Sequence, residues 1–467
     1  MVRRRQRERS LFEVLLPDGH KLWPDWLRRI DTLLEDESVI EVVAQAMEAR
    51  WPQSRRRGRP GTPAEIVIRM LILKHLFDWS YDDLEQEVRA NLVYRAFTRI
   101  DADEVPDAKT ILKIAGALGP EVIAQLHRQV IDVATRAGVT RGRRFRIDTT
   151  VVETNVHYPT DSTLLQDGVR VLTRTLQRAS TALGDRPGRV RNRLRSVTRR
   201  VLTIGYQARS PKTRDALIES YRKLTATTRA VLRDADTMVR RIAQRRRRAA
   251  DGAATILDRA RTHLQRMRPV VERVVHQTRA RLLGGDTHVP DKVLSLFEPH
   301  TTTIRKGKIS KPNEFGNLVT IQESEHQIIT AYEVHTGRPA DVTLWTAALD
   351  RHHALFGRAP HLAAGDRGFS SATNEQAATD RGVRRVVLPR RGPKSATRRA
   401  YERQAWFRRG QRWRVGCEGR ISVIKRRHGL RRCRYHGVDG MHRWVGLGVI
   451  ADNLINMATV LGRRAAA

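Results

Sequence analysis

The sequence QRWRVGCEGRISVIKRRHGLRR, from Gln411 to Arg432, carries a single acidic side chain, Glu418, among many basic ones. In a helix with about 100° per residue, Arg414, Glu418 and Lys425 lie within roughly 40° of one another. The stretch therefore predicts a helix with one carboxylate in a basic face. A solvated helix with an ordinary Arg–Glu pair at i,i+4 gives the same pattern, so this helix alone does not indicate a function.

A first strand is predicted by RRFRIDTTVVET, from Arg143 to Thr154, where aromatic and β-branched side chains recur at alternate positions. Asp148 lies in the middle of this strand. A carboxylate in such surroundings is costly to desolvate unless a cation or hydrogen bonds compensate. The alternative to a functional role is a structural aspartate with polar partners.

A third acid, Asp366, follows a short predicted strand from His361 to Gly365 and is flanked by Gly365 and Gly368. Glycines let another backbone or a phosphate approach closely. The acids thus occur in the order Asp on a first strand, Asp at the end of a later strand and Glu on a helix. Three such carboxylates can hold two divalent cations about 3.5 to 4 Å apart, and hard oxygen ligands favour Mg²⁺ or Mn²⁺.

The chain is strongly basic, with a formal net charge of +38 over 467 residues. A positive field of this size indicates nucleic acid as a partner, although architectural or ribosomal-type binding fits the charge alone. Most basic residues are Arg, which suits phosphate contacts, but a GC-rich genome produces the same bias. The hydrophobic content of 40% is enough to fill the cores of two or three domains.

Other features exclude several classes of protein. The two cysteines, Cys417 and Cys433, form no CxxC pattern, so neither a disulfide framework nor a zinc site is predicted and a reducing cytoplasm is expected. The basic N-terminus has only a short apolar run, which argues against a signal peptide. The apolar stretch 441–461 carries Asp452, Asn453 and Asn456, which favours a buried helix over a membrane span.

Residues 1–140 are expected to form an all-α N-terminal domain for DNA binding or assembly. Helix starts are predicted at a capping box from Thr62 to Glu65, at Ser80, after Asp107 and at Pro120. The two helices joined by the turn at 78–80 fit either a helix-turn-helix or a plain helical bundle.

A basic loop, WPQSRRRGRPGTP, runs from Trp51 to Pro63. Within it, Arg57 and Arg59 resemble a minor-groove hook, in which an extended arm places two Arg side chains in a narrow A·T-rich groove. A solvated basic linker is the alternative.

Residues 161–285 are predicted to be an Arg-rich helical insertion, most basic at Arg245 to Arg248. Its charge suits DNA binding, and pairing of protomers is the alternative. After the insertion, strands are predicted at 292–297, 317–323, 327–335 and 383–388, with a loop at 301–311. Asp341 is predicted to be the N-cap of the helix that follows the strand at 327–335.

These motifs together resemble the bacterial insertion-sequence transposases of the DDE superfamily. The resemblance rests on RIDTTVVETN around Asp148, AAGDRGFSS around Asp366 and RVGCEGRISVIK around Glu418. Arg414, Glu418 and Lys425 match three positions of the Tyr-Arg-Glu-Lys signature. Gln411 stands where the signature has Tyr, which puts that residue's phosphate contact in question; Trp406 or Trp413 could stack on a displaced base instead.

The segment GRPGTPAEIVIRMLILKHLFDWSYDDLE looks like the N-terminal domain of these enzymes, and TNVHYPTDSTLLQDGVRVLTR with its long insertion is most similar to the ISNCY-like group. The resemblance implies an α/β fold, with a ribonuclease-H-like core at 141–160 and 286–467 that is built from a mixed sheet and flanking helices. It implies that Asp148, Asp366 and Glu418 are the catalytic residues and hold two Mg²⁺ or Mn²⁺ ions. The expected DNA contacts are Arg414, Lys425, Arg57, Arg59, Arg367, Arg426 and Arg427.

The implied function is binding to the terminal inverted repeats of a mobile element, hydrolysis at its 3′ ends and joining of these ends to target DNA. The partner is then double-stranded DNA, with a homo-oligomer as the active complex, a cytoplasmic, nucleoid-associated location and no membrane. Two alternatives stay open, a catalytically inactive descendant that only binds DNA and a ribonuclease-H-like nuclease without strand transfer.

Overall fold

The computed structural model describes residues 2–5, 19–50, 61–100, 104–248, 250–286, 289–305 and 313–467. The chain divides into two compact units. The first contains Met1–Asn155 and Ile304–Ala467, and the second contains Val156–Thr303. The three predicted catalytic acids all belong to the first unit.

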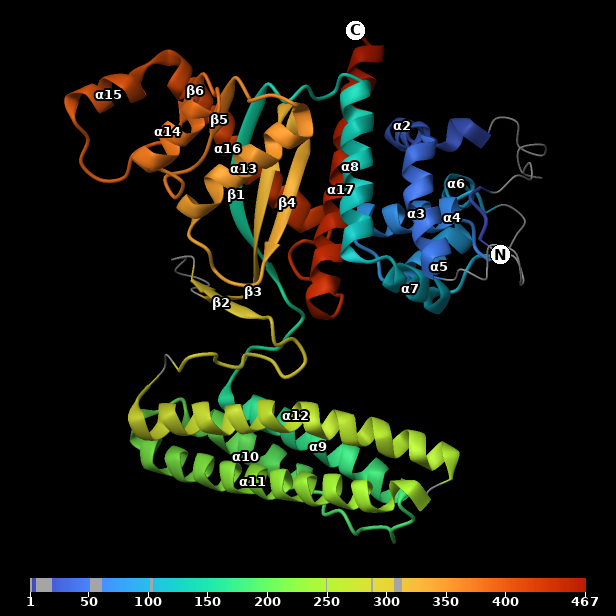
Figure 1. Ribbon diagram of the computed structural model, residues 1–467. Helices are drawn as coiled ribbons and strands as arrows, with labels where there is room; N and C mark the ends of the chain where they lie inside the picture. Colours follow the sequence, from blue (N-terminus) through green and yellow to red (C-terminus); the bar gives the residue numbers. More distant parts are fainter. Residues whose placement is uncertain are drawn as a thin grey trace. The chain divides into compact units, whose positions relative to one another are not determined.

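The first unit begins with helices that share one hydrophobic core with the C-terminal helix α17 (Gly437–Ala465). Figure 1 shows α17 beside α8, and α17 also packs against α2 and α4. The helix α4 is buried along its whole length, and its Arg69 forms ion pairs with Glu65 and Asp31. The N-terminal helices are η1 (Gly19–Leu22), α2 (Asp25–Leu34), α3 (Glu37–Arg50), α4 (Ala64–Leu76), α5 (Tyr81–Ala90), α6 (Leu92–Phe97), α7 (Ala108–Ala117) and α8 (Pro120–Arg136).

The predicted starts of these helices have mixed outcomes. Ser80 caps α5 in a capping box with Asp83, and Asp107 caps α7, as predicted. The predicted capping box at Thr62 is wrong, because α4 begins at Ala64 with Pro63 as a cap that makes no side-chain hydrogen bond. The backbone N–H groups of Ala64 and Glu65 instead donate to the carbonyls of Arg3 and Arg4.

The described residues of the first unit form a six-stranded mixed sheet in the order β2-β3-β1-β5-β6, with β4 also paired to β3. The strand β1 lies antiparallel to β3 and parallel to β5, and β5 lies parallel to β6. Asp148 is paired with Ile321 of β3. The strands are β1 (Arg144–Glu153), β2 (Thr302–Arg305), β3 (Asn313–Glu323), β4 (Ile329–His335), β5 (Leu362–Ala364) and β6 (Arg385–Val387).

The predicted strand at 292–297 is wrong. In this segment the Gln277 side chain accepts a hydrogen bond from the backbone N–H of Val293 and donates one to its carbonyl. The Ser295 hydroxyl accepts from the backbone N–H groups of Phe297 and Glu298. Side chains therefore satisfy backbone groups that a strand would pair with a neighbouring strand. In the predicted loop at 301–311, residues 302–305 instead form β2.

Helices cover both faces of β1. Phe145 and Ile147 pack with Leu344 and Trp345 of α13 (Asp341–Phe356). Val152 packs on the opposite face with residues of α16 (Ala405–Arg427) and α17. The unit also contains η5 (Glu325–Gln327), α14 (Ala372–Asp380) and α15 (Ala396–Arg403). Residues at even positions of β1, including Asp148, therefore point toward α16.

The helix α17 is long and apolar enough to cross a membrane by length and composition, but 78% of its apolar window is buried inside the structure. Asp452, Asn453 and Asn456 are buried within it. The Asn453 side chain accepts from the backbone N–H of Ile329 and donates to the carbonyl of the same residue, which docks α17 onto β4. This is the pattern of a core helix.

The start of β1 is held by the carboxylate of Glu325, at the turn between β3 and β4. This carboxylate accepts hydrogen bonds from the Thr140 and Ser324 hydroxyls and from four successive backbone N–H groups, those of residues 141–144. Burial alone would raise the pKa of Glu325, but these hydrogen bonds lower it to about 2. The strand that carries Asp148 is thus fixed at its first residues by one side chain.

The second unit contains four long helices around their own hydrophobic core (Figure 1). Gly168 of α9 fits closely against Val271 of α12, where a Cβ would lie 2.9 Å from the Val271 methyl groups. This bundle contains the predicted helical insertion. Its helices are α9 (Asp161–Ala182), α10 (Leu194–Gln207), η3 (Pro211–Thr213), α11 (Arg214–Arg245), η4 (Arg246–Arg248) and α12 (Asp251–Gly284).

Candidate active site

Asp148 is largely buried in the middle of β1, with 14% of its side chain exposed. Its Oδ1 accepts a hydrogen bond from the backbone N–H of Thr149 at 2.8 Å. Burial raises the pKa of Asp148 to about 6, and the nearby carboxylates of Asp366 and Glu418 act in the same direction, whereas the Thr149 N–H and Arg414 oppose the shift. A cation placed here would therefore relieve a costly buried negative charge.

Glu418 projects from α16, and Arg414 joins it to Asp148. The Arg414 guanidinium lies 2.7 Å from Glu418 Oε1 and 3.6 Å from Asp148 Oδ2. The Glu418 side chain is 59% exposed and accepts a hydrogen bond from Arg414. Of the predicted stripe of Arg414, Glu418 and Lys425, the structure joins Arg414 and Glu418, and Arg414 lies beside the acid of the first strand.

Asp366 follows β5, the parallel neighbour of β1. Its Oδ1 accepts a hydrogen bond from the backbone N–H of Gly368 at 2.6 Å, so the turn after β5 fixes its direction. It lines a pocket of about 700 Å³ together with Arg414 and Glu418. The other lining residues are Arg367, Pro389, Arg408, Gln411, Arg412 and Val415.

The three acids do not form a ready ligand cluster in this structure. Among the residues described, no group of three or more His, Cys, Asp or Glu side chains is close enough to hold a metal ion. The Arg414 guanidinium instead bridges Asp148 and Glu418. The donor set nevertheless fits Mg²⁺ or Mn²⁺, because it consists of hard carboxylate oxygens. Arg414 would have to move for the carboxylates to share an ion.

A further acid near the site, Asp341, has a different role from the predicted one. Ala340 is the N-cap of α13, and Asp341 is the first residue of the helix. The Asp341 Oδ1 accepts a hydrogen bond from the Thr149 hydroxyl at 3.1 Å. The N-cap prediction is therefore wrong, because the helix begins one residue earlier than predicted, and the Asp341 side chain contacts β1. Sequence spacing cannot distinguish these two arrangements.

The predicted DNA contacts are distributed unevenly. Arg367 and Arg414 line the pocket of Asp366. Arg408 and Arg412 line it as well, although neither was a predicted DNA contact. Their i,i+4 spacing on α16 is a signal that the sequence already contained. Lys425 and Arg426 lie in the last turn of α16. Arg427 lines a second pocket, whereas Arg57 and Arg59 are outside the described residues.

Gly368 gives the first testable prediction. A Cβ at this position would overlap the Asp341 carboxylate and would lie 2.8 Å from Asp366 Oδ1. We expect Gly368→Ala to displace Asp366 and to lower the DNA cleavage rate on the order of a hundredfold, as displacements of about 1 Å can do. The rate is measured on labelled DNA at saturating Mg²⁺.

Gly116→Ala in α7 is the control for this prediction, because a Cβ there meets nothing within 4 Å. Its cleavage rate should equal that of the unmodified protein. Cleavage by Gly368→Ala at the unmodified rate would show that the turn after β5 tolerates the extra atom and does not fix Asp366.

Comparison with known proteins gives two family matches. Residues 12–115 match the family described as "Transposase domain (DUF772)", and residues 374–458 match the family described as "Transposase DDE domain". The second match includes Glu418 and most of α17. A similar curated protein is the "Uncharacterized protein ORF8 in nfe locus" of Rhizobium meliloti, 26% identical over 158 residues, which are 31% of this chain and 76% of that protein.

No solved structure matches the chain. The two family matches lie in the N-terminal helices and in the last third of the chain, which both belong to the compact unit that carries Asp148, Asp366 and Glu418. Both families are described as transposase domains, one of them of the DDE type. Two separate parts of this unit are therefore similar to transposase domains, and the part that contains Glu418 is similar to one of the DDE type.

Proposed function

We propose that the protein binds the terminal inverted repeats of an insertion sequence, hydrolyses the phosphodiester bonds at its 3′ ends and joins these ends to target DNA. The observation that carries the proposal is the position of Arg414 between acids that come from three different elements. Arg414 contacts Asp148 and Glu418, and Asp366 lines a pocket with Arg414 and Glu418. The DDE family match supports the same reading.

Asp148, Asp366 and Glu418 are proposed to hold two divalent cations. The buried position of Asp148, with its raised pKa, favours a site in which a cation compensates the charge. Bound there, such ions would activate the attacking oxygen and stabilise the leaving oxygen of a phosphodiester. Arg414 is proposed to leave the two carboxylates and contact a DNA phosphate, because a guanidinium suits bidentate phosphate binding.

The surrounding arginines are proposed to bind and orient the DNA backbone. Arg367, Arg408 and Arg412 line the same pocket as Asp366 and Glu418, so a scissile phosphate near Asp366 would have cations on several sides. Such phosphate contacts fix position and register without reading sequence. Lys425, Arg426 and Arg427 of α16, and Arg57 and Arg59 of the N-terminal arm, are proposed as further DNA contacts.

We assign the parts of the chain as follows. Residues 1–140 serve DNA binding and assembly, residues 141–160 with 286–467 form a ribonuclease-H-like catalytic core of the ISNCY-like group, and residues 161–285 form the basic helical insertion. Double-stranded DNA is the partner, the active complex is a homo-oligomer, and the enzyme works in the cytoplasm at the nucleoid.

The decisive experiment uses purified protein, Mg²⁺ and labelled duplexes that end in the inverted repeats flanking the gene. We expect nicks at the 3′ ends of the repeats and covalent joining of these ends to a target plasmid. Cleavage without joining would favour a nuclease. End binding without either reaction would favour an inactive descendant.

The basic insertion gives a second prediction, on salt dependence. Replacing Arg245, Arg246, Arg247 and Arg248 with Gln should lower the affinity for DNA. The slope of the logarithm of the binding constant against the logarithm of the salt concentration should also become flatter, by about 0.9 for each duplex phosphate that these side chains neutralise in the unmodified protein. Arg246 should contribute least, because its guanidinium already binds both carboxylate oxygens of Asp258. Affinity is measured by fluorescence anisotropy from about 50 to 200 mM salt, a range over which salt weakens such binding strongly.

The matched control for the salt measurement is Arg246→Gln alone, which should change the slope little. An unchanged slope in the fourfold variant, together with a shift in its sedimentation, would assign the insertion to protomer pairing in place of DNA binding.

A further inference from the structure

We infer that two buried ion pairs, Arg146–Glu323 and Arg420–Asp452, set the rotation of α16 and thereby aim Glu418 at Asp148 and Asp366. The inference rests on the proposed metal site. It assigns these four residues as positioning residues, since none of them lines the pocket of Asp366.

The first pair docks α16 onto the sheet. Arg146 of β1 is 3% exposed and Glu323 of β3 is fully buried, and Arg146 Nε donates to Glu323 Oε2 at 3.2 Å. A second guanidinium nitrogen of Arg146 donates to the backbone carbonyl of Trp413 in α16. The thiol of Cys417, also in α16, lies beside the Glu323 carboxylate. Two positions of α16 one turn apart are therefore in contact with this one pair.

The fit around Arg146 is tight. A Cβ at Gly416 of α16 would lie 2.6 Å from the Arg146 guanidinium. The same guanidinium lies 4.9 Å from the centre of the Trp413 ring. Rotation of α16 about its axis would break these contacts, and Arg146 is only two residues from Asp148 on the same face of β1.

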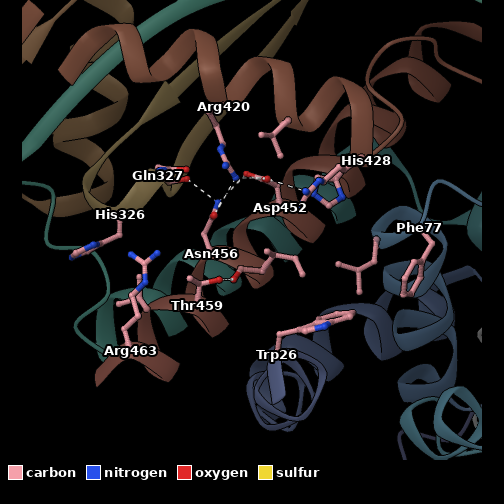
Figure 2. A pocket seen from close by; sticks show the side chains of 15 residues that line it. Trp26, Phe77, His326, Gln327, Arg420, His428, Asp452, Asn456, Thr459 and Arg463 are labelled. Carbon is pink, nitrogen blue, oxygen red and sulfur yellow. Dashed lines mark hydrogen bonds and ion pairs between the residues drawn. The ribbon is translucent and has the colours of Figure 1, made fainter. Parts of the chain in front are cut away.

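The second pair holds α16 against α17. Arg420 donates to Asp452 Oδ1 of α17 at 2.7 Å and to Asn456 Oδ1 at 3.0 Å. The Asn456 amide in turn donates to Asp452 Oδ2 and to the carbonyl of Gln327. The remaining partner is His428, 3.5 Å from Asp452. Figure 2 shows this network along one wall of the second pocket, of about 690 Å³.

The two pairs hold the same face of α16. At about 100° per residue, Trp413, Cys417 and Arg420 lie within about 60° of one another, and this face is about 100° to 160° from Glu418. Contacts at these positions leave Glu418 little freedom to turn about the helix axis. Its remaining freedom is that of its own side chain.

The chemistry of these two ion pairs suits a role in orienting α16 better than a role in stabilising the protein. Replacing a buried ion pair with apolar residues of similar volume is often neutral or stabilising. Here each pair also retains a buried polar atom without a hydrogen-bond partner in the described structure, Glu323 Oε1 in one and Arg420 Nε in the other. Specific placement of α16 explains why two such costly pairs contact its buried face.

The test replaces each pair with apolar residues, in Arg146→Met/Glu323→Leu and in Arg420→Met/Asp452→Leu. Mn²⁺ affinity is measured by electron paramagnetic resonance, and stability by urea unfolding, both on the full chain. We expect both double variants to unfold at or above the urea concentration of the unmodified protein. Their Mn²⁺ dissociation constants should rise at least about tenfold, since residues that orient ligands typically contribute 10- to 100-fold in metal affinity.

Arg241→Met/Asp185→Leu in the second unit is the control, because this ion pair is also largely buried. Its Mn²⁺ affinity should be unchanged. A folded double variant of either α16 pair that binds Mn²⁺ like the unmodified protein would overturn the inference. If the double variants do not fold, Arg420→Lys tests the inference instead, because it keeps the charge but removes the forked guanidinium. Unchanged Mn²⁺ affinity in Arg420→Lys would also overturn the inference.

Glu418→Gln separates this inference from the proposed function. If Glu418→Gln leaves Mn²⁺ affinity unchanged, the proposed metal site itself fails. If Glu418→Gln weakens Mn²⁺ binding and the folded double variants do not, only the positioning inference fails.

Discussion

Asp148→Asn, Asp366→Asn and Glu418→Gln should each abolish DNA cleavage and leave binding to the transposon ends nearly unchanged. Each change removes one charged metal ligand but little phosphate contact, because the pocket lined by Asp366 and Glu418 keeps its arginines. The Asp148 change should also relieve a buried charge, so this variant should be at least as stable as the unmodified protein.

The measurement is single-turnover cleavage of labelled repeat ends in Mg²⁺, with end binding followed by gel shift in Ca²⁺. Asp350→Asn is the control, since Asp350 is an exposed residue of α13 that pairs with Arg381 at the surface. It should cleave normally. Metal-dependent cleavage near the normal rate in any one of the three acid variants would remove that residue from the site.

Glu325→Gln should cause a large loss of stability. The amide has one acceptor oxygen and a donor group, so it cannot accept from six donors as the carboxylate does. The pKa of Glu325 falls from 4.5 to about 2 on folding. After a discount for partial exposure, this corresponds to about 2 to 3 kcal/mol of stability at neutral pH.

The pH dependence of this loss follows from the direction of the shift. Because the folded pKa is lower than the unfolded one, the stabilisation is fully present above pH 4.5 and is lost as the pH falls toward 2. The difference in unfolding free energy between Glu325→Gln and the unmodified protein should therefore shrink over this range. Urea unfolding at pH 7 and pH 3 measures it.

Glu87→Gln is the matched control for Glu325, because Glu87 is an exposed residue of α5. Its effect should stay within about 0.5 kcal/mol at both pH values. A difference between Glu325→Gln and the unmodified protein that is the same at pH 7 and pH 3 would mean that the charge of Glu325 does not stabilise β1.

The positions of the acids on their elements could be predicted from the sequence. Alternation around Asp148 predicted a strand, glycines around Asp366 predicted a turn after a strand, and the spacing of Arg414 and Glu418 predicted one helical face. All three features are local, since side-chain period and turn chemistry depend on neighbouring residues. The structure has Asp148 in β1, Asp366 after β5 and Glu418 in α16.

The wrong predictions instead result from contacts with residues that are not neighbours in the sequence. The segment 292–297 has strand-like side chains, yet Gln277 of α12 binds its backbone. Asp341 has the residue type and position of an N-cap, yet it accepts from Thr149 on another element. In both cases a side chain from another element competes with the local preference and replaces it.

The sequence by itself determined the order of the three acids, the period of each element and the basic charge of the chain, because these depend on local chemistry and composition. Only the tertiary structure decided that Arg414 bridges Asp148 and Glu418, that Gly368 leaves room for Asp366, and that two ion pairs hold the buried face of α16. The hydrogen bonds of Arg146 to Trp413 and of Arg420 to Asp452 join residues 267 and 32 positions apart in the chain. Their formation depends on strand order and helix packing, which no local spacing encodes.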